Sequence, residues 1–208
     1  MKFVTKIILT TLLSIVALNG HEHWLFTDAP SYKVGESIAI HLQSGHVLGD
    51  SEFLISTRLI REAFVITPSG EDTSFVFEVN GNEHIYVFKA DKPGQYTVLV
   101  NLRKRNKGQF THLLKTTFLV GNTPYDTQKS KNQELEIVFG DSSHSLRVLT
   151  NGEAVNVPIK LMTEDQIDRS LIMNRKGISV FASESPGFHV AVCHFRRQAA
   201  SFSFYSLE

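Results

Sequence analysis

Short runs in which apolar and polar residues alternate recur along residues 21–208, separated by glycine, proline, asparagine and aspartate. This pattern is typical of an all-β chain, because successive residues of a strand face opposite sides of a sheet. In the first half it predicts strands at Ser37–Gln43, Glu62–Thr67, Ser74–Glu78, Ile85–Phe88, Gly94–Leu102 and Phe110–Val120. In the second half it predicts strands at Leu135–Phe139, Leu146–Thr150, Val155–Met162, Ile178–Ser183, Gly187–Phe195 and Ser201–Leu207.

A polar segment that contains Pro124 separates the two sets of predicted strands and is typical of a linker. We therefore expect two immunoglobulin-like β-sandwich domains, at residues 21–121 and 132–208, joined by a linker at residues 122–131. Two Pro-Gly turns, Asp91–Tyr96 and Ser185–Phe188, each precede a predicted strand and resemble corners of such sandwiches. One short helix is expected at Asp165–Met173.

The first 20 residues have the pattern of a secretory signal peptide. Lys2 and Lys6 precede an apolar run at residues 7–18, which is too short to span a bilayer, and Gly20 supplies a small residue for cleavage. Cleavage after Gly20 would export the protein with His21 as its first residue. Cleavage after Ala17 would leave three residues before His21 and remove the terminal amine from any site built there.

The segment His21-Glu22-His23 has the composition of a metal chelate. A terminal amine, two backbone nitrogens and the imidazole of the third residue form a square-planar nitrogen site that suits Cu(II) or Ni(II). The amine and the imidazole of His21 could instead bind together and leave positions open for further ligands. A solvated terminus that binds nothing is the alternative, and the apolar residues Trp24, Leu25 and Phe26 argue against it because they should anchor the segment.

His46 is the candidate ligand from outside the terminus, because it follows a predicted strand in the loop Ser44-Gly45-His46. The predicted metal ligands are therefore His21, His23 and His46. Whether His84 or His112 adds to the site is left open by their positions at the starts of strands.

Charge and motif content exclude several classes of function. The chain has 21 basic and 21 acidic residues, and removal of Lys2 and Lys6 leaves 19 basic ones and a net charge of −2. Neither nucleic acid nor an anionic membrane surface is thus favoured as a partner.

No nucleophile elbow and no glycine-rich phosphate loop occur, so we expect no enzyme. Cys193 is the single cysteine, so the chain cannot form an intramolecular disulfide. We expect Cys193 to be buried and to pack as a small apolar residue.

Several short motifs resemble a family of exported bacterial proteins, described as periplasmic components of cobalt or nickel uptake systems. In the first half they are His21–Phe26, Tyr32–Glu36, Ser44–His46 and Asp91–Gly94. In the second half they are Leu149–Ala154, Asn174–Ile178, Ser185–Val190 and Ser203–Leu207. The resemblance implies that the second domain is a carboxypeptidase-regulatory-like sandwich. It also places His21 and His46 on the histidine positions of the family and implies that a membrane transporter subunit receives the metal.

The resulting hypothesis is a periplasmic protein that binds Ni(II) or Co(II) and delivers the metal to a membrane uptake system. Cu(II) is the alternative, because nitrogen and oxygen ligands generally bind Cu(II) more tightly than Ni(II) or Co(II). This chain departs from the family at Glu22-His23, where an acidic residue and an aromatic residue are more usual. A second hypothesis is a non-catalytic module that binds a protein or a glycan. A third is a copper-dependent oxidase, because an N-terminal histidine with a second histidine resembles the copper brace of polysaccharide monooxygenases.

Overall fold

The computed structural model describes residues 21–104, 110–125, 133–142, 144–165, 169–171, 174, 177–180 and 187–206. The expected signal peptide and most of the expected linker lie outside these residues. The described part consists of β-strands and one 3-10 turn, η1 (Thr57–Leu59), so the all-β prediction is confirmed. Among the described residues, no helix has the length and apolar character needed to cross a membrane.

A four-stranded sheet forms one layer of the first half. Its strands are β1 (Glu22–Thr27), β3 (Ser37–Gly45), β7 (Glu83–Lys89) and β6 (Glu78–Asn80), which are neighbours in that order and antiparallel. Ile38, Ile40 and Leu42 alternate along β3 and are fully buried, as expected for the inner face of a sandwich.

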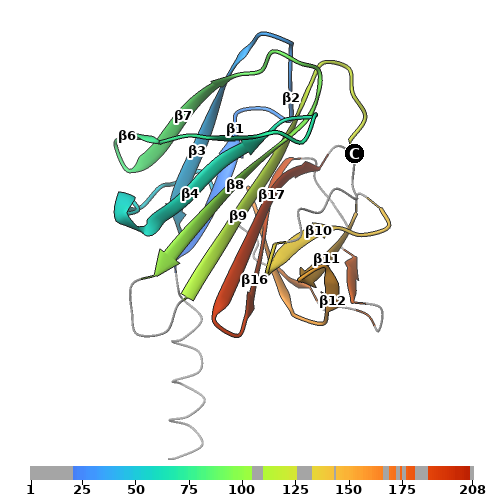
Figure 1. Cartoon of the computed structure of the whole chain (residues 1–208). Coiled ribbons are helices and arrows are strands. Elements are labelled where there is room, and N and C mark those ends of the chain that lie inside the picture. Colours follow the sequence, from blue (N-terminus) through green and yellow to red (C-terminus); the bar gives the residue numbers. More distant parts are fainter. Residues whose placement is uncertain are drawn as a thin grey trace, which may run out of the picture.

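The largest sheet runs through both halves of the chain. In spatial order it contains β14 (Arg169–Leu171), β13 (Ile159–Thr163), β16 (Gly187–Phe195), β17 (Gln198–Ser206), β9 (Phe110–Val120), β8 (Gly94–Lys104), β4 (Ile60–Ile66) and β5 (Asp72–Ser74). The short β2 (Ser31–Tyr32) also pairs with β9. The final strand β17 pairs in parallel with β9, and this pairing joins the two halves, as Figure 1 shows.

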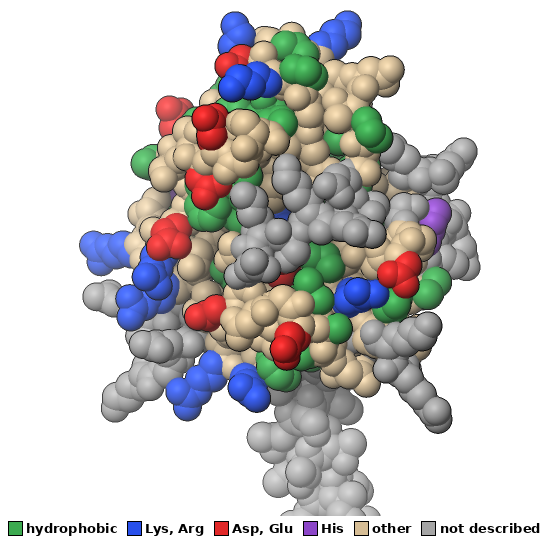
Figure 2. Space-filling model, turned by 45° about the vertical axis from the view of Figure 1, so that its right-hand side comes forward, with side chains coloured by type: hydrophobic (Ala, Val, Ile, Leu, Met, Phe, Trp, Pro, Cys, Tyr) green, Lys and Arg blue, Asp and Glu red, His purple; other side chains and the backbone are tan. Residues whose placement is uncertain are grey.

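A third sheet covers the second half and consists of β10 (Glu136–Phe139), β11 (Ser145–Thr150), β12 (Glu153–Val155) and β15 (Ile178–Val180). These stacked and mostly antiparallel layers form an immunoglobulin-like β-sandwich fold. On the face drawn in Figure 2, lysine and arginine side chains are interspersed with aspartate and glutamate. The described residues drawn on that face form no extended basic patch, which agrees with the near-neutral composition.

Three apolar cores hold the layers together. The first lies under the four-stranded sheet and includes Tyr96 and Phe118, whose rings stack with centroids 5.4 Å apart. The second lies under the third sheet and includes buried Cys193, which confirms the prediction for that residue. The third packs Trp24 of β1 against Phe188 and other residues of β16. Because β1 has Leu25 in the first core and Trp24 in the third, the start of this strand is fixed on both faces.

Three of the predicted elements are wrong in part. The predicted strand Val155–Met162 is divided, because β12 ends at Val155 and β13 begins at Ile159. The predicted strand Ser74–Glu78 is interrupted, because Phe75 and Phe77 leave the strand pattern and pack with ring centroids 5.0 Å apart against the first core. In the expected helix Asp165–Met173, the described residues Arg169–Leu171 form β14 at the edge of the large sheet. Pairing with β13 gives the backbone N–H and C=O groups of this segment the hydrogen bonds that a helix would otherwise supply.

Gly94 illustrates how tightly the first sandwich is closed. Its φ is +140°, and a Cβ there would lie 2.5 Å from Cβ and Cγ of Pro68. We expect Gly94→Ala to lower the free energy of unfolding by about 2–3 kcal/mol, measured by urea denaturation. Gly70→Ala is the matched control, since Gly70 has a φ of +86° but open space around it. Equal losses for the two variants would mean that backbone strain, and not the Pro68 contact, sets the cost.

Candidate metal centre

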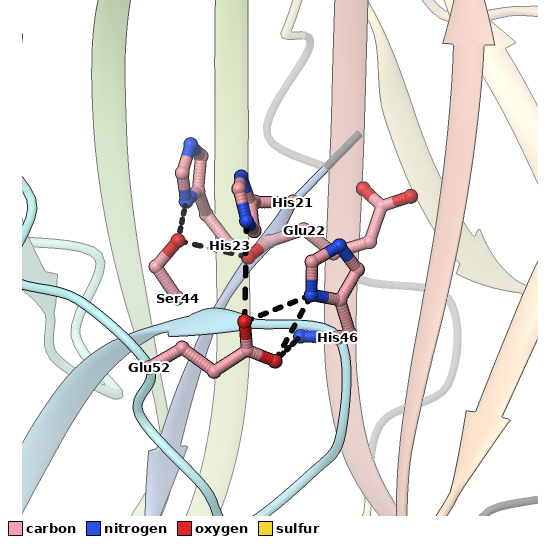
Figure 3. A network of polar contacts seen from close by, with 6 residues as sticks. All are labelled: His21, Glu22, His23, Ser44, His46 and Glu52. Carbon is pink, nitrogen blue, oxygen red and sulfur yellow. Dashed lines mark hydrogen bonds and ion pairs between the residues drawn. The ribbon is translucent and has the colours of Figure 1, made fainter. Parts of the chain in front are cut away.

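Two histidines and a carboxylate meet at the start of β1. One ligand atom from each of His21, His46 and Glu52 lies within 4.8 Å of the other two. His46 Nδ1 is 2.8 Å from Glu52 Oε2, and His21 Nε2 is 3.9 Å from the same oxygen. The His21 and His46 ring centroids are 4.3 Å apart, and Figure 3 shows both rings beside the carboxylate. The structure thus brings together two of the three histidines predicted as ligands.

The pairing of β1 with β3 explains why these residues meet. Glu22 is opposite Gly45 and His23 is opposite Ser44, so His21 lies beside the point where β3 ends. The chain then turns back, and the Glu52 N–H donates a 3.0 Å hydrogen bond to the Ser44 carbonyl. A Cβ on Gly45 would lie 2.7 Å from the Asp50 carbonyl oxygen, so this return requires glycine at position 45.

The Glu52 carboxylate is held in its charged form. The backbone N–H of His46 donates to Glu52 Oε1 at 2.7 Å, and this bond is the main reason why the pKa of Glu52 lies below its usual value. The His46 imidazole hydrogen bond lowers the pKa of Glu52 further, and the charges of His46 and His21 add smaller contributions. A carboxylate that is ionised across the physiological range is a ready oxygen ligand beside two imidazoles.

The three ligand side chains remain accessible from solvent. His21 is 47% exposed, His46 44% and Glu52 32%. A metal ion could therefore reach the site directly and would keep coordination positions for water or for a receiving protein. Two imidazole nitrogens and one carboxylate oxygen suit Zn(II), Cu(II), Ni(II) or Co(II) rather than Mg(II) or Ca(II).

His23 lies beside this cluster and outside its three ligand atoms. Its Nδ1 is 2.6 Å from Ser44 Oγ, and that hydroxyl donates to the Glu22 carbonyl at 3.2 Å. In Figure 3 the His23 ring lies on the other side of His21 from His46. Its ring centroid is 5.4 Å from that of His112. The prediction of His23 as a ligand stays a prediction, with a position next to the site and not within the triad.

The two histidines left open by the sequence are both buried. His84 Nε2 is 2.6 Å from the Ile55 carbonyl, and its ring packs near Phe77 in the first core. His112 Nε2 is 2.7 Å from Ser201 Oγ. Burial holds the pKa of His112 well below its usual value, and the nearby His23 and His194 lower it further. Neither residue joins the cluster of His21, His46 and Glu52.

Glu52 is the site residue that sequence reasoning missed. It follows His46 by six positions in a polar segment, and no pattern of alternation marks it. The available signal was the glycine at position 45, which allows a tight return of the chain. The carboxylate becomes a candidate ligand only once the hydrogen bond between Glu52 and Ser44 shows that the loop closes.

Comparisons with known proteins identify no family for this chain. No family model matches, and no curated protein matches either. A solved Salmonella alpha-2-macroglobulin is 12% identical over 89% of this chain, with a TM-score of 0.36. A DUF4785 family protein from Legionella pneumophila is 10% identical over 88% of this chain and 56% of its own, with a TM-score of 0.33. The Escherichia coli adhesin FdeC is 12% identical over 89% of this chain and 64% of its own, with a TM-score of 0.31.

The present chain spans only 15% of the length of the Salmonella protein. Matches at these identities and TM-scores assign neither a family nor a function.

Proposed function

We propose that this protein is an exported, non-catalytic protein that binds a late transition metal ion and passes it to a membrane uptake system in the periplasm. The observation that carries this proposal is the convergence of His21, His46 and Glu52 on one accessible point. The family resemblance favours Ni(II) or Co(II) as the metal that is carried. Cu(II) is the alternative, because such ligands generally bind it more tightly.

The position of the site supports a role that begins with export. Removal of residues 1–20 would give His21 a free amine next to its imidazole. The amine and imidazole of His21 would then add to the His46 imidazole and the Glu52 carboxylate, giving four donors from two segments. The burial of Trp24 and Leu25 holds the first segment in place, which reduces the entropy lost when the metal binds.

Metal affinity of single variants tests the proposed site. With the exported protein, whose N-terminus is first established by mass spectrometry, we expect His46→Ala and Glu52→Gln each to weaken Ni(II) binding at least tenfold in calorimetric titrations. One nitrogen or oxygen ligand is lost in each case, and the remaining ligands stay in place. His144→Ala is the control, because His144 lies in a turn far along the chain from β1 and outside the cluster.

The same titration tests the terminal amine. One additional residue before His21 should weaken Ni(II) binding if the amine is a ligand, and unchanged affinity would remove the amine from the site. Equal affinities for His46→Ala, Glu52→Gln and His144→Ala would contradict the proposed site as a whole.

A second candidate function, an interaction module, is favoured by apolar side chains exposed around one edge of the four-stranded sheet. Val79 of the edge strand β6 is 54% exposed, the preceding Val76 84% and Val87 of β7 62%. Exposed edge strands with apolar residues are docking positions for other chains. Equilibrium dialysis that finds no Ni(II) site tighter than a generic histidine pair would favour this function over metal binding.

A further inference from the structure

A pocket opens where β1 meets the second half of the chain, next to the loop that carries His46 and Glu52. Its volume is about 410 Å³, which is within the range of about 300–1,000 Å³ that is usual for small-molecule sites. Its lining includes Trp24, Phe26, Asp28, Glu164, Phe188 and Tyr205. The residues come from both halves, and such junctions are common positions for ligand sites.

Aromatic rings form much of the wall. The centroid of Phe188 is 5.7 Å from that of Phe26 and 5.4 Å from that of Tyr205. Trp24 is fully buried at the pocket, and its indole N–H has no hydrogen-bond acceptor among the described residues. Aromatic faces carry partial negative charge and attract cations, most strongly where water is excluded.

Two carboxylates add negative charge at the same pocket. Asp28 and Glu164 are exposed, and Asp28 Oδ1 is 3.2 Å from His41 Nε2. Neither carboxylate pairs with a lysine or an arginine among the described residues. Burial raises the pKa of Tyr205 to about 12, and the charges of Glu164 and Asp28 contribute to this rise together with Tyr32. Both carboxylates therefore lie close enough to Tyr205 for their charges to act on its hydroxyl.

We propose that this pocket binds a small organic cation, an ammonium or trimethylammonium group carried on a short apolar body. The rings of Phe26, Phe188 and Tyr205 contact the charged head, and Asp28 and Glu164 balance its charge. A metal ion alone would find no nitrogen ligand among the lining residues and would leave most of the volume empty. The pocket uses none of the three proposed metal ligands, and the proposal does not depend on the metal centre.

Trp24 provides the readout for a test, because it is the only tryptophan in the chain and lies in the pocket wall. We expect choline to change the Trp24 fluorescence in a saturable way. Its neutral isostere 3,3-dimethyl-1-butanol should bind at least tenfold more weakly, since it has the same shape without the charge. Equal binding of the two compounds, or no saturable response to choline at millimolar concentration, would overturn the proposal.

Matched variants localise the binding. Glu164→Gln and Phe26→Leu should each weaken choline binding at least fivefold, because the first removes a charge and the second an aromatic face. Glu153→Gln, at an exposed carboxylate of β12, should leave the affinity unchanged. Calorimetry of the same variants checks that fluorescence reports binding. Equal affinities for Glu164→Gln and Glu153→Gln would contradict a site at this pocket.

A third ligand separates a free small molecule from a side chain of a partner protein. Nα-acetyl-lysine N-methylamide presents a lysine ammonium as it occurs in a protein. We expect it to bind more weakly than choline, because its peptide groups must lose water at a pocket with few polar partners. Tighter binding of the lysine compound than of choline would overturn the small-molecule assignment.

Discussion

Replacing Glu136 by leucine is expected to lower the free energy of unfolding by about 3–5 kcal/mol. Glu136 Oε1 is 2.8 Å from Lys115 Nζ, and the two side chains are only 3% and 7% exposed. The Lys115 ammonium also lies 4.4 Å from the centroid of the Phe202 ring. Without the carboxylate, a buried ammonium would lose its main compensation for desolvation, and burial already lowers the pKa of Lys115.

A double-mutant cycle separates the interaction energy of this ion pair from the cost of lost packing. Lys115→Met combined with Glu136→Leu removes both charges and keeps similar volumes, so the double variant should be markedly more stable than Glu136→Leu alone. Chemical denaturation at pH 7 measures all four proteins. A cost below about 1 kcal/mol for Glu136→Leu, or a double variant less stable than either single one, would contradict the expected coupling.

The same ion pair shows which features of the fold were accessible from the sequence. The predicted strand Gly94–Leu102 corresponds to β8, and its alternating residues Tyr96, Val98 and Val100 are each at most 1% exposed. No pattern in the sequence showed that Lys115 of β9 meets Glu136 of β10. That contact depends on how the third sheet lies across the large sheet, which is a property of tertiary packing.

The first strand was missed for a related reason. Residues 22–27 do not alternate between apolar and polar, because β1 is covered on both faces. Leu25 packs in the first core, whereas Trp24 packs against the second half of the chain. Strands covered on both faces cannot be distinguished from other apolar runs by periodicity alone. The parallel pairing of β17 with β9 joins residues far apart in sequence and has no local signal either.

In the candidate site too, some residues could be predicted from the sequence and others could not. His21 and His46 could be selected from the sequence because a processing event and a glycine-containing loop marked them. Glu52 could not, because its role comes from the closure of the loop onto Ser44. His23 was selected with His21, but its Nδ1 lies within hydrogen-bonding distance of Ser44 Oγ and its ring lies beside His112, outside the cluster of three ligand atoms.

The buried His112 should make the metal-free protein sensitive to mild acid. Burial, followed by the nearby His23 and His194, holds the pKa of His112 well below that of an unfolded histidine, which is about 6.5. Below about pH 6.5 the unfolded chain therefore binds a proton at this position that the folded protein excludes. The stability due to neutral His112 is complete above pH 6.5 and is lost as pH falls, at about 1.4 kcal/mol per pH unit.

Urea denaturation of the chelator-treated protein at pH 7 and pH 5 measures this dependence. The wild-type protein should lose stability between the two pH values through His112, by at most about 2 kcal/mol. His112→Gln keeps a polar group near Ser201 and cannot titrate. The free energy of unfolding that this variant loses between pH 7 and pH 5 should therefore be smaller than the wild-type loss by the part due to His112, whatever the stability of the variant at pH 7. His144→Gln, at the half-buried histidine of a turn, should keep the wild-type dependence. The same loss in His112→Gln and His144→Gln would show that another group causes the acid sensitivity.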